Sequence, residues 1–151
     1  MTGRTLTWGE RALARSLYRD AIDLDRVEVR RRKWWPLQPR SIVMAPRGHL
    51  HFHPDSQAYC DDFSHAPLPL QGLFVHELCH VWQHQHGLIL PLRRHPFCRY
   101  RYDIVPGRPL QQYGIEQQAE IVRHAFLLRH GQRLDGKPAA AVYEALLTAF
   151  D

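Results

Sequence analysis

Residues 76–80 read His76-Glu77-Leu78-Cys79-His80, and this pentapeptide decides how the rest of the chain is interpreted. On an α-helix, four residues turn through about 400°, so the two histidines lie roughly 40° apart on one face. Two imidazole nitrogens placed in this way can hold one zinc ion, and Glu77 on the neighbouring flank can reach a water at the metal. The pattern therefore predicts the core of a zinc hydrolase site, with Glu77 as the general base.

The sequence around the pentapeptide has the period of a helix. Apolar residues recur at three- and four-residue steps through the motif, namely Leu73, Phe74, Leu78, Val81 and Trp82. Gly87 follows where the C-cap glycine of a helix belongs. We therefore expect an amphipathic helix over residues 70–86, with Cys79 packed in the core. The alternative that needs no metal is a buried helix with hydrogen-bonded histidines.

Two histidines and a water leave a tetrahedral zinc ion one protein ligand short. His86 lies ten residues after His76, as the third histidine of a metzincin does, but Gln83 stands where that pattern has its glycine. Without the glycine the helix continues, and a helical His86 would lie about 8 to 9 Å along the axis from His80. His84 would lie more than about 10 Å along the axis from His76. Both are therefore expected to be polar residues of the helix surface.

A carboxylate from a later helix is the better candidate for the third ligand. Residues 112–129 carry an apolar stripe of helical period, formed by Ile115, Ala119, Val122, Phe126 and Leu127. Glu116 and Glu120 lie one turn apart beside this stripe. One of them could bind zinc while the other holds a ligand histidine by its second ring nitrogen. A solvated pair on an exposed helix face is the alternative, and the need for one more ligand favours the metal site.

The two predicted helices resemble a known family. The segments FVHELCHVWQ (74–83) and YGIEQQAEIV (113–122) resemble the small Vgr-related and Rhs-related zincin-like proteins of bacteria. They are also similar to the metallopeptidase domains attached to some type VI secretion spike proteins. The resemblance implies a gluzincin-like site in which His76, His80 and Glu116 hold one Zn²⁺ per chain and Glu120 supports a ligand. It also implies a peptide substrate and a secretion-spike partner. Peptide bonds in proteins, peptide cross-links of the cell wall and self-processing all fit such a site.

The chemistry predicted from these residues is metal-assisted hydrolysis of a peptide bond. Glu77 would take a proton from water and later pass it to the leaving amine. The donor for the oxyanion is left open among Tyr113, His84, His86 and Tyr102, with Tyr113 one turn before the predicted glutamate ligand. The alternative function is a zinc-stabilised, non-catalytic adaptor or binding module on a secretion spike. The intact Glu77 argues against it, because a structural zinc site needs no base.

Length and pattern indicate the fold class. The 151 residues are 44% hydrophobic and 23% charged, which is typical of one globular domain over residues 1–151. We expect an α+β, zincin-like (gluzincin-type) fold, in which a small mixed sheet packs on the two helices described above. Strands are expected at 26–35, 41–45, 49–53 and 99–105, and further helices at 8–20 and 139–150.

The sequence also indicates the cellular compartment of the protein. It has no apolar run of 18 residues, so no membrane span is expected, and its first residues lack the apolar core of a signal peptide. The cysteines Cys60, Cys79 and Cys98 form no CxxC pattern, which suits a reducing cytoplasm. We expect a protein that is cytoplasmic as synthesised. Any export would use a signal-independent secretion system, as the resemblance permits.

Two further clusters, one of basic and aromatic residues and one of histidines, can be explained without a binding site. The net charge is +5, and Arg30-Arg31-Arg32-Lys33 precedes Trp34-Trp35. Basic residues beside aromatic ones can bind nucleic acid, but we favour a charged strand face with the tryptophans in the core, so no nucleic-acid partner is expected. His49, His51 and His53 would share one face of a strand. An exposed strand face, available to pair with an extended substrate, is favoured over a second metal site.

Overall fold

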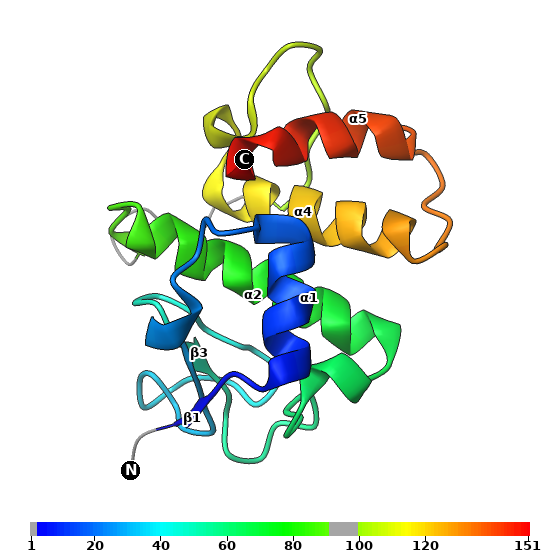
Figure 1. The fold of residues 1–151 in the computed structure, drawn as a ribbon. Coiled ribbons are helices and arrows are strands. Elements are labelled where there is room, and N and C mark those ends of the chain that lie inside the picture. The colour runs from blue at the N-terminus through cyan, green and yellow to red at the C-terminus, as the bar shows by residue number, and fades with distance from the viewer. Residues whose placement is uncertain (1–2, 91–99) are drawn as a thin grey trace.

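The computed structural model describes residues 3–90 and 100–151. Three short strands and four α-helices make an α+β structure in this part of the chain, as expected (Figure 1). In chain order they are β1 (Arg4–Thr5), α1 (Trp8–Tyr18), β2 (Glu28–Arg30), β3 (Leu50–His51), α2 (Leu68–Gln85), α4 (Ile115–Arg129) and α5 (Ala140–Leu146). The 3₁₀ turns are η1 (Leu24–Arg26), η2 (Phe63–His65), η3 (Leu110–Gln112) and η4 (Leu147–Phe150).

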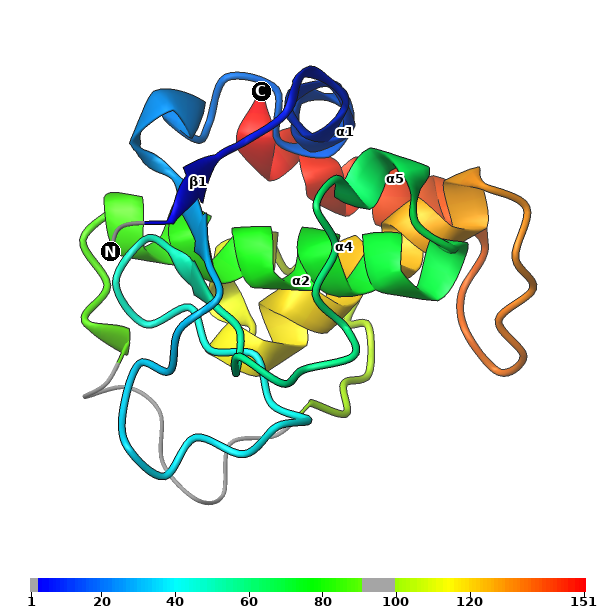
Figure 2. The same cartoon turned by 90° about the horizontal axis from the view of Figure 1, so that it is seen from below.

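Helices α2 and α4 form the centre of the molecule and pack against each other (Figures 1 and 2). Helix α5 covers α4, while α1 packs against η2 and η4. Gly72 of α2 lies where the helices come close, since a Cβ atom built on it would be 3.4 Å from Cγ of Arg123 and 3.5 Å from Cδ2 of Leu127. This close packing fixes the position of α4 relative to the pentapeptide.

The ends of α2 are set by its sequence. Pro67 is the N-cap residue and Pro69 lies in the first turn, where the missing proline N–H breaks no helical hydrogen bond. The helix ends at Gln85, and Gly87 follows with φ of +93°, a left-handed conformation that glycine adopts without strain. Expectations of a helix over 70–86 and of a buried Cys79 are both confirmed.

A buried carboxylate joins the start of the chain to the segment before α2. Thr7 and Glu10 form a capping box at the start of α1. The fully buried Glu10 also accepts hydrogen bonds from both terminal nitrogens of Arg4, at 3.0 and 2.8 Å, and from the amide of Phe63 at 3.0 Å. Glu10 therefore holds β1, α1 and η2 together.

The sheet is smaller than predicted. Its order is β1-β2-β3, with β1 antiparallel to β2 and β2 parallel to β3. β1 was not expected. The strands predicted at 26–35 and 49–53 shrink to three and two residues.

Two predicted strands, 41–45 and the described part of 99–105, do not form. In segment 41–45, Met44 alone pairs, through an isolated antiparallel bridge to His51. Residues 100–105 have no strand, and residue 99 lies outside the described part. Among the residues described, none of the helices has the length and hydropathy needed to cross a membrane.

The structure also differs from expectation at the basic and aromatic cluster 30–35 and at the three histidines of segment 49–53. Trp34 is half-buried and Trp35 is 43% exposed, so the tryptophans are not folded into the core. His51 is buried and His49 is half-buried, with its Nδ1 accepting a hydrogen bond from the Glu28 amide. The three histidines therefore do not form an exposed face.

Candidate metal centre

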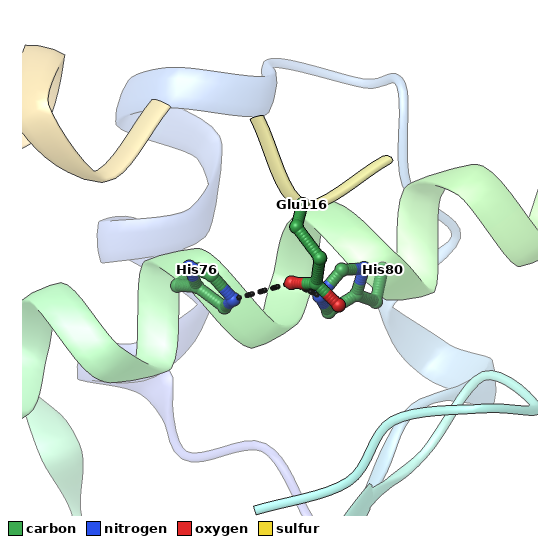
Figure 3. A group of neighbouring side chains, drawn as sticks. All are labelled: His76, His80 and Glu116. Carbon is green, nitrogen blue, oxygen red and sulfur yellow. Dashed lines mark hydrogen bonds and ion pairs between the residues drawn. The ribbon is translucent and has the colours of Figure 1, made fainter. Parts of the chain in front are cut away.

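The two histidines of the pentapeptide and one glutamate of α4 meet between the central helices. Nε2 of His76 lies 3.3 Å from Oε1 of Glu116, and Nε2 of His80 lies 3.0 Å from the same oxygen. Figure 3 shows the Glu116 carboxylate lying against both imidazole rings. All three side chains are buried, and one ligand atom from each lies within 4.8 Å of the others. Within residues 3–90 and 100–151 this is the one such group, and it could bind a metal ion.

The ring of His76 is oriented by Glu120. Nδ1 of His76 lies 2.9 Å from Oε2 of Glu120, and Arg123 donates two hydrogen bonds to the same carboxylate, at 2.6 and 2.8 Å. Burial raises the pKa of Glu120, but the hydrogen bonds from His76 and Arg123 outweigh it and lower the pKa to about 2. An ionised carboxylate only accepts, so Nδ1 of His76 donates and its Nε2 is directed toward Glu116.

The ring of His80 is oriented by Gln83, a residue that the sequence analysis did not assign to the site. Nδ1 of His80 lies 2.9 Å from Oε1 of Gln83. The amide nitrogen of Gln83 donates to the Ile115 carbonyl and to Oε1 of Gln118, both at 2.9 Å. This fixes Oε1 as the atom that faces His80, so Nδ1 of His80 is the donor. Nε2 of both histidines is thus directed inward for a ligand.

The charges around the site favour a bound cation. Three carboxylates, from Glu77, Glu116 and Glu120, line the same cavity as one guanidinium, from Arg123. Two negative charges therefore remain, which one divalent cation would neutralise. The same negative charge favours the protonated form of His76. Burial lowers the pKa of His76, but its hydrogen bonds to Glu116 and Glu120 raise it to about 10. Burial raises the pKa of Glu116, but the two histidines bring it well below its ordinary value.

A cavity of about 300 Å³ gives access to this centre. Glu77 lines it beside the three candidate ligands. Its walls come from two other places in the chain, the segment 41–43 and Tyr100. The ring of Tyr100 stacks on the ring of His76, with 6.1 Å between centroids and 16° between planes. The site is therefore an open, water-accessible centre rather than a closed one.

Comparison with known proteins identifies the relatives of the chain. No family model matches it. A solved structure described as the effector domain of Pseudomonas aeruginosa VgrG2b is 35% identical, with a TM-score of 0.79 over 97% of this chain and 82% of that one. The chain belongs to the family of the VgrG2b effector domain. The type VI secretion system spike protein VgrG2b of P. aeruginosa is 41% identical over 133 residues, which is 83% of this chain but 13% of the spike protein.

Membership in the VgrG2b effector family confirms the secretion-spike part of the resemblance. Neither relative's name mentions a peptidase or a metal.

The two aromatic candidates for the oxyanion donor do not lie at the metal centre of this family member. The Tyr113 hydroxyl accepts a hydrogen bond from the Val105 amide at 3.0 Å, and Tyr113 is not among the residues that line the cavity. The Tyr102 hydroxyl lies 2.6 Å from His124 and from Tyr143.

The two remaining oxyanion candidates also lie outside the cavity of this VgrG2b relative. His84 faces Gly48, and His86 is the exposed C-cap residue of α2, with its Nδ1 2.9 Å from the Trp82 carbonyl. Arg123 and Tyr100, by contrast, reach the cavity without having been predicted. Arg123 lies three residues after Glu120 on the same face of α4, a spacing that could have revealed it. Tyr100 has no such signal, because its position depends on the path of a loop.

Proposed function

We propose that this protein is a zinc-dependent metallopeptidase domain with a zincin-like, gluzincin-type fold. One observation carries the proposal. The pentapeptide helix and α4 bring two inward-directed imidazole nitrogens and a carboxylate to one side of a cavity that Glu77 also lines. Two histidines, a glutamate and an open position are the ligand set of hydrolytic zinc sites.

The kind of ligand atom supports zinc as the metal, and two of the distances between these atoms suit it. With zinc–ligand bonds of 2.0 to 2.2 Å, two corners of a tetrahedron lie about 3.3 Å apart. The two nitrogen–oxygen distances to Glu116, 3.3 and 3.0 Å, are close to that value. Nitrogen and oxygen donors also suit zinc better than magnesium or calcium, which prefer oxygen alone. We assign one zinc ion per chain to His76, His80 and Glu116.

Each residue around the centre then has a distinct role. A zinc ion held by His76, His80 and Glu116 would act as a Lewis acid that polarises a carbonyl and acidifies water. Glu77 accepts the proton of the attacking water and passes it to the leaving amine. Glu120 and Gln83 hold the ligand rings in place, and Arg123 holds Glu120. Tyr100 replaces Tyr113 as our candidate for the residue that contacts the carbonyl oxygen, because it lines the cavity.

The family points to the setting of this activity. The relatives are an effector domain and the spike protein that contains it, so we propose that the present chain also acts as an effector associated with a type VI secretion spike. A peptide or protein, including cell-wall peptide, is the substrate class that the chemistry allows. An adaptor without catalysis would have no use for Glu77 inside the cavity.

Metal content and turnover in three proteins test the proposal. We expect one zinc per chain in the wild type by elemental analysis, retained in Glu77→Gln and lost in Glu116→Ala. Unfolded casein should be cut by the wild type alone. Because Glu77→Gln is isosteric, cleavage by this variant at the wild-type rate would contradict the assignment of the base. A wild type that takes up no zinc would contradict the metal site itself.

A further inference from the structure

A second cavity lies against the metal centre and is apolar. Its volume is about 210 Å³, and it shares His80 and Glu116 with the first cavity. Among the described residues, the rest of its lining is apolar: Trp34, Met44, Ala45, Pro46, Leu90 and Ile115. Pockets for whole small-molecule ligands usually measure about 300 to 1,000 Å³, so this one is the size for a single side chain.

The segment 41–46 connects the two cavities. Ser41, Ile42 and Val43 line the cavity of the metal centre, and Met44, Ala45 and Pro46 line the apolar one. Met44 is in an extended pairing with His51, with main-chain hydrogen bonds of 3.1 and 2.7 Å. This segment therefore forms the edge beyond β3, in place of residues 49–53, which the sequence had indicated. A peptide lying along it would pass over both cavities in turn.

The lining determines which side chain would fit. Trp34 is half-buried and offers a flat apolar wall that costs little conformational entropy to use. Glu116 lies at the boundary with the metal centre, so an acidic side chain would meet a like charge in a poorly solvated place. A large apolar side chain loses no hydrogen bonds on entering.

We infer that the apolar cavity binds a large aliphatic or aromatic side chain of the substrate, next to the bond that is cut. The inference rests on the proposed peptidase function and narrows its substrates to peptides that carry such a residue at one fixed side of the cleaved bond. Trp34 is the specificity-determining residue. Its neighbour Trp35 is 43% exposed and is not among the residues that line the cavity, so Trp35→Ala is a matched control.

Binding of two hydroxamates to the zinc-loaded protein tests the pocket without turnover. Acetohydroxamate carries a methyl group, and 4-methylpentanohydroxamate carries a leucine-like isobutyl group. By calorimetry we expect the second compound to bind about 10-fold or more tightly to the wild type and to Trp35→Ala. The difference should shrink to a few-fold or less in Trp34→Ala. Equal affinities in the wild type, or a difference that Trp34→Ala leaves unchanged, would overturn the inference.

Mapping of cleaved bonds gives the second readout. Fragments of unfolded casein, sequenced by mass spectrometry, should show large apolar residues on one fixed side of the bonds cut by the wild type. Trp34→Ala should relax that preference and Trp35→Ala should keep it. Zinc uptake and Glu77-dependent cleavage without any such preference would overturn the pocket alone. Absence of zinc uptake and of Glu77-dependent cleavage would overturn the peptidase function and the pocket together.

Discussion

At the scale of single residues, the features that most distinguish this site are the partners of the ligand histidines. His76 and His80 each use Nδ1 to hold a fixed acceptor, Glu120 in one case and Gln83 in the other. The acceptor fixes the tautomer and the angle of the ring before any metal arrives. A metal ion therefore meets ligands that are already oriented.

Gln83→Ala should weaken zinc binding although Gln83 does not contact the metal. The variant frees the ring of His80 and removes the side-chain hydrogen bond from Gln83 to the Ile115 carbonyl. We expect a fall in zinc affinity of about 10- to 100-fold, measured by competition with a chromogenic chelator. Gln85→Ala is the control, because Gln85 lies on the same helix but bonds to Asp23. An unchanged affinity in Gln83→Ala would show that His80 is oriented by other contacts.

His51 makes the fold sensitive to acid in a way that is separate from the metal centre. Burial, helped by the charge of Arg30, lowers its pKa from 6.5 to about 4. The unfolded chain takes up a proton near pH 6.5, whereas the folded protein takes it up only near pH 4. The stability that neutral His51 contributes is therefore fully present above pH 6.5 and is lost as the pH falls toward 4.

Replacing His51 should reduce this dependence on pH. In His51→Gln, the free energy of unfolding in urea should change less between pH 6.5 and 4.5 than in the wild type, both measured without metal. His65→Gln is the control, because the side chain of His65 is 85% exposed. A slope in His51→Gln equal to that of the wild type would assign the acid sensitivity to other groups.

At the scale of elements, the contact between α2 and α4 sets the geometry of the site. Two ligands come from one helix and the third from the other, so the distance between the helices determines whether three ligands can reach one ion. Gly72 lies in this contact, under the side chains of Arg123 and Leu127, one turn before the first ligand histidine.

The size of the residue at position 72 should therefore control zinc affinity. A Cβ atom there would make ordinary contacts at 3.4 and 3.5 Å, so Gly72→Ala should raise stability by about 0.5 to 1 kcal/mol by favouring the helix. Gly72→Leu should push α4 away and lower both the melting temperature and zinc affinity. Calorimetry and chelator competition on the two variants provide the comparison. A Gly72→Leu protein with wild-type zinc affinity would show that the helix contact does not position Glu116.

The sequence predicts the helices with their ends, but it places only two of the three strands and makes them too long, for a physical reason. The predicted helix over 70–86 and the structural one, Leu68–Gln85, differ by two residues or fewer at each end because a period of apolar residues and a terminal glycine mark it locally. The strands are two or three residues long, too short for alternation to appear, and their pairing joins distant segments such as Val29 and Leu50. Gln83 was missed because an uncharged amide carries no pattern of its own.

At the scale of the whole molecule, the metal centre lies where the packed pair α2 and α4 meets a segment that has little pairing of its own. The ligands come from residues 76, 80 and 116, and the cavity wall at 41–43 belongs to a segment with almost no sheet pairing. The Glu116 carboxylate lies against both ligand histidines, and that of Glu120 lies against one of them. A divalent ion would replace the contacts of Glu116 with stronger ones and neutralise both remaining charges, while Glu120 keeps its contact with His76.

Zinc should therefore stabilise the entire fold. At free zinc about 100 times its dissociation constant, linkage adds about 2.7 kcal/mol to the free energy of unfolding, which corresponds to a rise in melting temperature of roughly 5 to 10 °C. Addition of EDTA should reverse the rise. Glu116→Ala should show no rise, and Glu77→Gln should keep it, because Glu77 is not a ligand in our assignment. If Glu116→Ala responds to zinc as fully as the wild type does, the stabilising ion binds elsewhere, and the ligand set must be assigned again.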